Sequence, residues 1–238
     1  MNALIFSVSF ALIAAGIFLS ARLFDKRIAI ALAVACAFYL GVDDFVTGLP
    51  PELHILSVLG GHWNWSGKIL SLLLSAIVIV AFGLSPAAVG LTLRQRNAGI
   101  GVIALALFVI WGACLGLLFK PGAPDAETLA FQAIMPGLSE ELVYRGIAPA
   151  LLLGMIRQQK PSEDMPWAAI FATALVFGVW HGLQYSDGKF GFDFMSALFP
   201  LIGSIPGGWL RFKTGSLVFP ILAHGIANVA FHVAGGIG

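Results

Sequence analysis

Residues 97–119 read NAGIGVIALALFVIWGACLGLLF and contain no charged side chain. A helix needs about 20 predominantly apolar residues to cross the hydrocarbon core of a bilayer, so this stretch is long enough to span a membrane. Because the bilayer core offers no water to the backbone polar groups, a segment of this kind crosses it as a helix. The stretch therefore predicts a membrane protein.

The composition of the whole chain also indicates a membrane protein. Of its 238 residues, 59% are hydrophobic and only 11% are charged, and the mean hydropathy is +0.94. A soluble domain has about 25% charged residues, so this chain lacks the polar surface of a water-soluble globule. The formal net charge is +1 and no basic stripe is present, which excludes a nucleic-acid partner. We expect a single integral membrane domain over residues 1–238, with the lipid bilayer around it.

Further apolar segments occur on both sides of the first one. Together they predict an all-α fold, a polytopic membrane helix bundle of about eight transmembrane helices with a buried polar site. The expected spans are residues 2–21, 28–42, 69–93, 97–119, 128–156, 166–185, 194–210 and 216–238.

Lysine and arginine fall mainly in alternate connections between these spans. Because cytoplasmic connections are the basic ones, we expect a multi-pass protein with both its N-terminus and its C-terminus on the outer side. The connections expected inside contain Arg22, Lys26, Arg27, Arg94, Arg96, Arg157, Lys160, Arg211 and Lys213. The connections expected outside contain Lys68, Lys120 and Lys189, and the longest of them also holds Trp63 and Trp65.

The segment SEELVYRG at residues 139–146 places three ionisable groups inside an apolar span. Ionisable residues within a membrane are costly and indicate function. On a helix, Glu141 and Arg145 are four residues apart and can form an ion pair, whereas Glu140 points about 100° away and is left without that partner. A carboxylate in this position is suited to act as a general base. The alternative is that all three residues form one structural group of ion pairs.

Two other spans carry histidines. His181 lies in the segment FGVWHG at residues 177–182, where it is either functional or an interface residue. His224 and Asn228 are four residues apart and share one helix face. They either form an interhelical hydrogen bond or provide two donors to an oxyanion.

Three short motifs follow one another along the chain and resemble a known set. They are Glu140-Glu141-x-x-x-Arg145, Phe177-x-x-x-His181 and His224-x-x-x-Asn228. The set is that of the CAAX protease and bacteriocin-processing (CPBP, or ABI) family, which includes the type II CAAX prenyl endopeptidases. The resemblance covers residues 131–229, the expected catalytic core. It implies a glutamic-type intramembrane protease that hydrolyses a peptide bond near the C-terminus of a membrane-anchored protein.

The resemblance also implies a role for each motif residue. Glu140 would activate water and His181 would bind and orient it. His224 and Asn228 would stabilise the oxyanion, while Glu141 and Arg145 would support the geometry of the site. We expect no cofactor and no metal, although Glu140, His181 and His224 are donor types that would also suit zinc.

The stretch DDFVTGLP at residues 43–50 resembles a bacterial branch of the family that is paired with JDVT-CTERM sorting signals. Enzymes of that branch are thought to remove a C-terminal membrane anchor. The resemblance implies a protein or peptide substrate with a C-terminal processing signal, and a location in the bacterial inner membrane. The carboxylates of Asp43 and Asp44 themselves are expected at a solvated helix end.

Two other functions fit the same residues. One is a non-catalytic membrane protein of the bacteriocin-immunity type. The other is a proton-coupled transporter, since intramembrane glutamate and histidine side chains also form proton relays. The absence of a sequence repeat relating the two halves of the chain disfavours the transporter.

Overall fold

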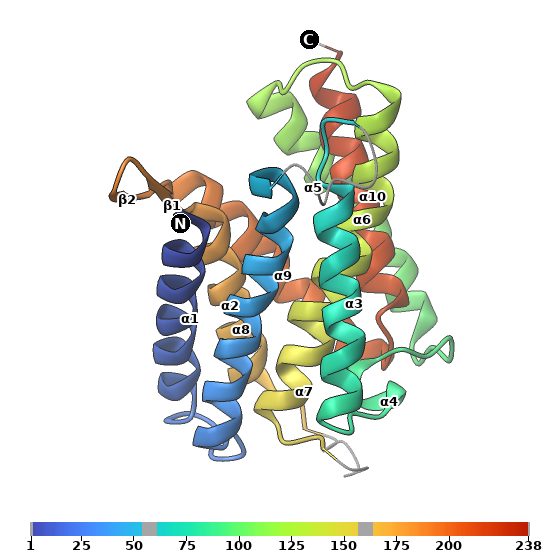
Figure 1. The fold of residues 1–238 in the computed structure, drawn as a ribbon. Coiled ribbons are helices and arrows are strands. Elements are labelled where there is room, and N and C mark those ends of the chain that lie inside the picture. The colour runs from blue at the N-terminus through green and yellow to red at the C-terminus, as the bar shows by residue number, and fades with distance from the viewer. Residues whose placement is uncertain (1, 54–60, 157–163, 238) are drawn as a thin grey trace.

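The computed structural model describes residues 2–53, 61–156 and 164–237, which form a bundle of helices and one small β-hairpin (Figure 1). The predicted all-α membrane helix bundle is confirmed, with the hairpin as an addition that the sequence did not indicate. The helices of the first half are α1 (Asn2–Ala21), α2 (Ile30–Leu53), α3 (Trp65–Ala81), α4 (Pro86–Val89) and α5 (Ala98–Phe119). The elements of the second half are α6 (Ala126–Glu141), the π-helix η1 (Leu142–Ile147), α7 (Ala148–Leu152), α8 (Trp167–Gly182), β1 (Leu183–Ser186), β2 (Lys189–Phe192), α9 (Phe194–Thr214) and α10 (Val218–Gly235).

Each expected span overlaps at least one of these helices, although α2 continues beyond residue 42 to Leu53 and α9 continues beyond residue 210 to Thr214. Within the described residues, 4 helices are long and apolar enough to cross a membrane by length and composition, namely α1, α2, α5 and α10. The integral membrane character follows from these helices, while the number of crossings stays a prediction. Both chain ends lie toward the upper end of the molecule in Figure 1.

The carboxylates of Asp43 and Asp44 lie within α2 and not at its end, so the expected solvated helix end is wrong. Asp43 accepts a hydrogen bond of 2.7 Å from the Ser71 hydroxyl on α3. Asp44 accepts one of 2.5 Å from Ser7 on α1 and one of 2.7 Å from the indole of Trp180 on α8. These donors satisfy the carboxylates inside the bundle, which allows α2 to continue through them.

Lys68 was expected in an outer surface connection, and this position is also wrong. The third helix begins at Trp65, because the Asn64 side chain accepts a hydrogen bond from the Gly67 amide and caps the helix. Lys68 therefore lies on α3, with only 8% of its surface exposed. A buried lysine requires a partner.

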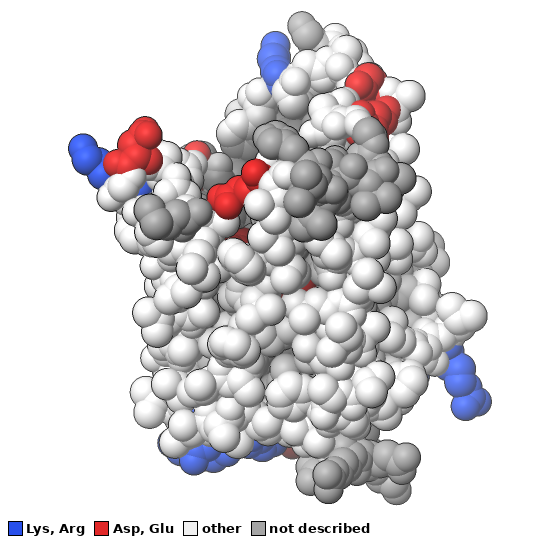
Figure 2. Space-filling view, in the orientation of Figure 1, with Lys and Arg blue, Asp and Glu red and all other residues white. Residues whose placement is uncertain are grey.

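Charged side chains on the visible face divide between the two ends of the bundle (Figure 2). Most aspartate and glutamate side chains lie in the upper half, whereas lysine and arginine side chains lie at both ends, with one group along the lower edge. Arg157 and Lys160, which the sequence placed on the basic side, lie outside the described residues.

The packing of α10 against α5 depends on glycine. The buried residues of α5 are Gly101, Gly112 and Gly116, while its large apolar side chains are mostly exposed, as in a helix that faces lipid. A Cβ atom at Gly112 would lie 2.1 Å from the carbonyl oxygen of Ala227 on α10. Small residues of this kind let two membrane helices approach closely, and this approach positions the face of α10 that carries Asn228.

Replacing Gly112 by alanine should therefore destabilise the bundle. The added methyl group meets backbone, which cannot move aside easily, and overpacking of this kind costs about 1–3 kcal/mol. The midpoint of thermal unfolding in detergent should fall by about 2–4 °C per kcal/mol. Gly99→Ala on the same helix is the control, because nothing lies within 4 Å of that added Cβ. Equal unfolding midpoints for the two variants would contradict this account of the α5–α10 contact.

Candidate active site

The two adjacent glutamates lie where α6 changes into the π-helix η1. Short π-helical turns inside helices are rare and are frequent at functional sites. Glu140 and Glu141 are 8% and 2% exposed, and Arg145 is 4% exposed. Three ionisable side chains are thus held in the interior within two turns of one helical segment.

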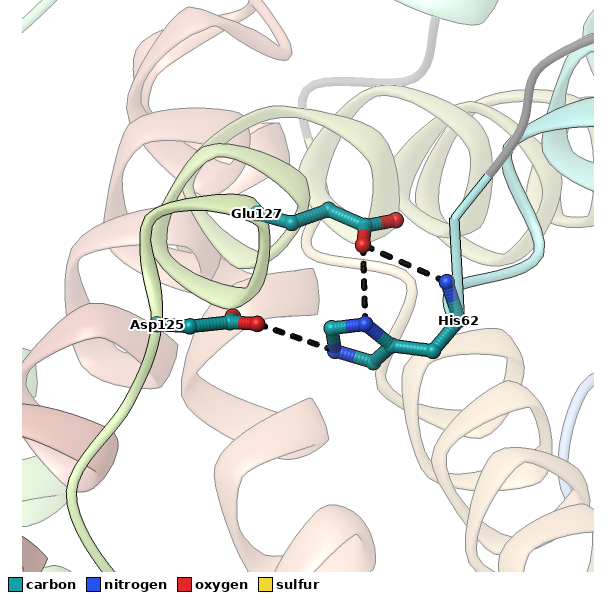
Figure 3. A group of neighbouring side chains, drawn as sticks. All are labelled: His62, Asp125 and Glu127. Carbon is teal, nitrogen blue, oxygen red and sulfur yellow. Dashed lines mark hydrogen bonds and ion pairs between the residues drawn. The ribbon is translucent and has the colours of Figure 1, made fainter.

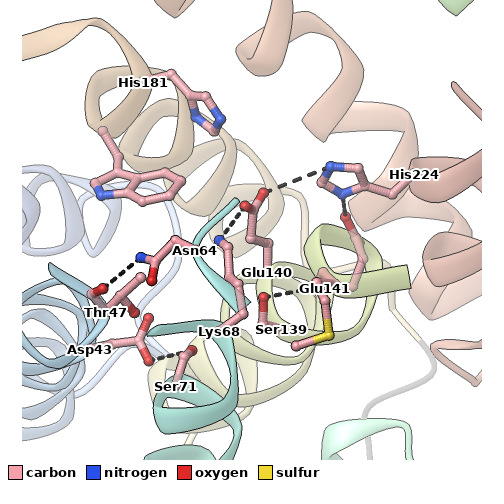
Figure 4. Close-up of polar contacts among 12 residues, drawn as sticks. Asp43, Thr47, Asn64, Lys68, Ser71, Ser139, Glu140, Glu141, His181 and His224 are labelled. Carbon is pink, nitrogen blue, oxygen red and sulfur yellow. Dashed lines mark hydrogen bonds and ion pairs between the residues drawn. The ribbon is translucent and has the colours of Figure 1, made fainter. Parts of the chain in front are cut away.

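Glu140 is paired with Lys68, so the prediction of a glutamate without an ionic partner is wrong. The ammonium nitrogen of Lys68 lies 2.6 Å from Oε1 of Glu140 (Figure 4). The same ammonium group lies 5.3 Å from the centre of the Trp180 ring, within range of a cation–π interaction. The second oxygen of Glu140, Oε2, faces Nε2 of His224 at 3.7 Å.

Glu141 connects two elements of the site. Its Oε1 atom lies 3.1 Å from the guanidinium of Arg145, which confirms the predicted pair. The same oxygen lies 2.8 Å from Nδ1 of His224 on α10, and the Arg145 guanidinium lies 4.3 Å from the centre of the Phe177 ring. A carboxylate on Nδ1 fixes the orientation of the imidazole, so Nε2 of His224 is directed toward Glu140.

His181 lies in the last turn of α8 and comes from the opposite side. Its Nδ1 atom lies 2.9 Å from the carbonyl oxygen of Phe177, one turn earlier. With Nδ1 donating to that carbonyl, Nε2 is an acceptor. The ring also packs against Phe177 and Trp180, with centroid distances of 4.5 Å and 4.7 Å. Figure 4 shows the rings of His181 and His224 both directed toward Glu140.

Asn228 lies one turn beyond His224 on α10. Its side-chain amide donates a hydrogen bond of 2.8 Å to the side-chain oxygen of Gln132 on α6. An amide NH₂ group has two hydrogens, so one donor of Asn228 remains for another acceptor. The predicted shared face of His224 and Asn228 is present, and an interhelical hydrogen bond also exists.

All six predicted site residues line one cavity of about 430 Å³, a volume within the range of ligand sites. Its polar wall contains Lys68, Gln132, Glu140, Glu141, Arg145, His181, His224 and Asn228, and its apolar wall includes Phe108, Trp111, Leu115, Phe131, Phe199 and Phe231. A site with a carboxylate, two imidazoles and an amide around an apolar cavity has the groups needed for attack of water on a carbonyl.

Sequence reasoning missed four polar residues of the cavity lining, namely Asn64, Lys68, Gln132 and Ser204. Gln132 could have been found from the sequence, because it is a polar amide within an apolar span. Lys68 had no such signal, because a lysine at the start of an apolar run is usual at a membrane boundary. Its burial against Glu140 arises from the packing of α3 on α6.

Two of the three donors considered for zinc already have one ligand atom bound. Lys68 occupies one oxygen of Glu140, and Glu141 binds one nitrogen of His224. Within the described residues, the group of donors whose ligand atoms lie within 4.8 Å of one another is elsewhere, at His62, Asp125 and Glu127.

Residues 124–230 match the family model described as type II CAAX prenyl endopeptidase Rce1-like. This segment is therefore similar to the CAAX protease family. The match confirms the family resemblance seen in the motifs and supports a hydrolase of the CAAX-type membrane endopeptidase class. Among the curated proteins and the solved structures, no match to the chain was found.

The Lys68–Glu140 pair should show strong energetic coupling. Lys68→Met leaves a buried carboxylate without its cation, and breaking a buried pair in this way costs about 3–5 kcal/mol. The double variant Lys68→Met/Glu140→Gln removes both charges and should recover much of that stability. Thermal unfolding of the two single variants and the double variant measures the coupling. Additive effects would contradict a buried ion pair.

Arg145→Ala should lower stability for a related reason. It removes the cation beside Glu141 and the contact with Phe177, so a loss of about 3–5 kcal/mol is expected. Arg27→Ala is the control, because Arg27 pairs with Asp25 at a surface where the arginine side chain is 40% exposed. Such exposed pairs contribute about 0–1 kcal/mol. If unfolding in detergent shows equal losses for both variants, the structural role of Arg145 is wrong.

Proposed function

We propose that the cavity hydrolyses a peptide bond with a water molecule activated by Glu140. The observation that carries the proposal is the convergence of Glu140, His181, His224 and Asn228 on one cavity in a family domain of endopeptidases. The family match favours this function over a proton-coupled transporter or a non-catalytic immunity protein.

The water is placed between the two sides of the cavity. Oε2 of Glu140 takes its proton, because Oε1 is already bound to Lys68. Nε2 of His181 accepts its second hydrogen and orients the oxygen for attack on the carbonyl carbon. The carboxylate then returns the proton to the leaving nitrogen as the C–N bond breaks.

The developing oxyanion is stabilised from α10. The Nδ1 atom of His224 faces the Glu141 carboxylate, so Nε2 carries a hydrogen for the oxyanion when the ring is protonated on both nitrogens. The remaining amide hydrogen of Asn228 is the second donor. Preorganised donors of this type stabilise a tetrahedral intermediate in a site shielded from water.

Lys68 has a positioning role in this scheme. It neutralises Glu140 while the cavity is empty, and it holds Oε1 so that Oε2 is the atom directed at the water. Arg145 pairs with Oε1 of Glu141, the same oxygen that faces Nδ1 of His224. Each carboxylate of the site is thereby paired with one lysine or arginine.

The substrate class follows from the second resemblance. We propose a protein or peptide with a C-terminal processing signal, anchored in the same bilayer. In support, residues 43–50 lie on α2 beside the cavity: Asp43 bonds Ser71 on α3, and the carbonyl of Thr47 accepts from Asn64, which lines the cavity. A bacterial inner membrane, with the acid-rich end of the bundle outside, is the location that fits this substrate.

Glu140→Gln should strongly lower cleavage, and thermal unfolding of the same sample checks that this variant, which leaves Lys68 without its carboxylate, is still folded. Glutamine keeps the size of the side chain but cannot accept a proton, so turnover should fall by about 10²–10⁴-fold. The assay uses purified chain in liposomes with two substrates: a farnesylated peptide ending in CAAX, and a reporter with a JDVT-CTERM-type C-terminal anchor. Glu52→Gln is the control, at an exposed glutamate near the end of α2.

Two results would oppose the proposal. Turnover by Glu140→Gln within tenfold of the unmodified chain would remove Glu140 as the base. Cleavage of the farnesylated peptide without cleavage of the anchored reporter would reject the proposed sorting substrate and retain the family activity.

A further inference from the structure

A second group of ionisable side chains lies outside the cavity, at the end of the bundle that carries the connection before α3. His62 belongs to that connection, Asp125 precedes α6, and Glu127 lies in its first turn. The imidazole lies between the two carboxylates (Figure 3), with Nδ1 2.8 Å from Oε2 of Glu127 and Nε2 3.8 Å from Oδ2 of Asp125. None of the three residues lines the catalytic cavity.

Each carboxylate has one oxygen held in place and the other directed at His62. Oδ1 of Asp125 accepts the Thr128 amide at 2.8 Å, as the cap of α6. Oε1 of Glu127 accepts the indole N–H of Trp65 at 3.1 Å. Metal ligands are typically oriented by hydrogen bonds of this kind from residues that do not themselves bind the metal.

The group has an excess of negative charge. A neutral imidazole has a single N–H, so it cannot donate to both carboxylates at once. Among the described residues, no lysine or arginine forms an ion pair with Asp125 or Glu127. The centre of the group is therefore favourable for a cation.

The distances suit a small divalent ion. One ligand atom from each residue lies within 4.8 Å of the other two. Zinc binds nitrogen and oxygen at about 2.0–2.2 Å, so two ligands of a tetrahedral zinc ion lie about 3.4 Å apart. Movements of about 1 Å in side chains at the surface would complete the site, and a mixed set of imidazole and carboxylates is more typical of zinc than of magnesium or calcium.

We propose that His62, Asp125 and Glu127 form a zinc-binding site, with one nitrogen and two carboxylate oxygens as ligands and water in the remaining position. The ion joins two elements of the fold. The next residue, Trp63, stacks on Phe131 with ring centres 4.9 Å apart, and both residues line the cavity. A bound ion ties the connection before α3 to the start of α6 and thereby holds Trp63 at the wall of the cavity.

Titration of the purified, metal-stripped chain with ZnCl₂ tests this site, after removal of any histidine tag. Calorimetry should show one ion per chain, and the midpoint of thermal unfolding should rise with zinc concentration because the ion binds the folded state. His62→Ala and Asp125→Asn should each weaken binding by at least tenfold. Asp187→Asn, at an exposed turn of the hairpin, should bind zinc as the unmodified chain does.

Titration of the Glu140→Gln variant distinguishes zinc binding at this site from zinc binding in the catalytic cavity. It should bind zinc with unchanged affinity and stoichiometry. Zinc binding that is lost in Glu140→Gln and kept in His62→Ala would overturn the proposal and place the ion in the cavity. The absence of stoichiometric binding to the unmodified chain would also overturn it. Since no cleavage is measured, the outcome does not depend on the proposed protease function.

Discussion

The rest of the site depends on the pairing of buried charge within an apolar bundle. A carboxylate that leaves water loses its hydration, and this cost is offset only when a cation and hydrogen bonds replace the water. Glu140 has Lys68 as its cation, and Glu141 has Arg145 together with His224. These contacts join α3, α6, η1 and α10, so the charges that carry the chemistry also determine which helices meet.

The same pairing determines what each group can do. Lys68 binds one oxygen of Glu140, and this leaves the second oxygen to face the cavity. Glu141 binds Nδ1 of His224 and thereby directs Nε2 at the reacting position. A site that holds two carboxylates and two cations in low dielectric is stable as a set, and it loses this balance when any one member is removed.

The site also requires that the backbones of neighbouring helices approach one another closely. Glycines on α5 leave room for α10, and Gly225 on α10 in turn lies against α6, where a Cβ atom would be 2.3 Å from the carbonyl of Ala133. Helices in lipid gain little from apolar burial against one another, so small residues and interhelical polar contacts provide the attraction. This packing brings the amide of Asn228 within 2.8 Å of Gln132 and completes the polar wall.

The sequence by itself determined the fold class, the approximate position of each helix and the motif residues, because hydropathy and residue spacing are local properties of the chain. It also gave the Glu141–Arg145 pair, which follows from a separation of four residues on one helix. It could not give the partner of Glu140, the depth of Asp43 and Asp44, or the hairpin after α8. Lys68 and Glu140 are 72 residues apart, and no periodicity relates them. Only the tertiary structure decided these contacts, since a charge in an apolar interior takes whichever partner the packing of distant helices brings to it.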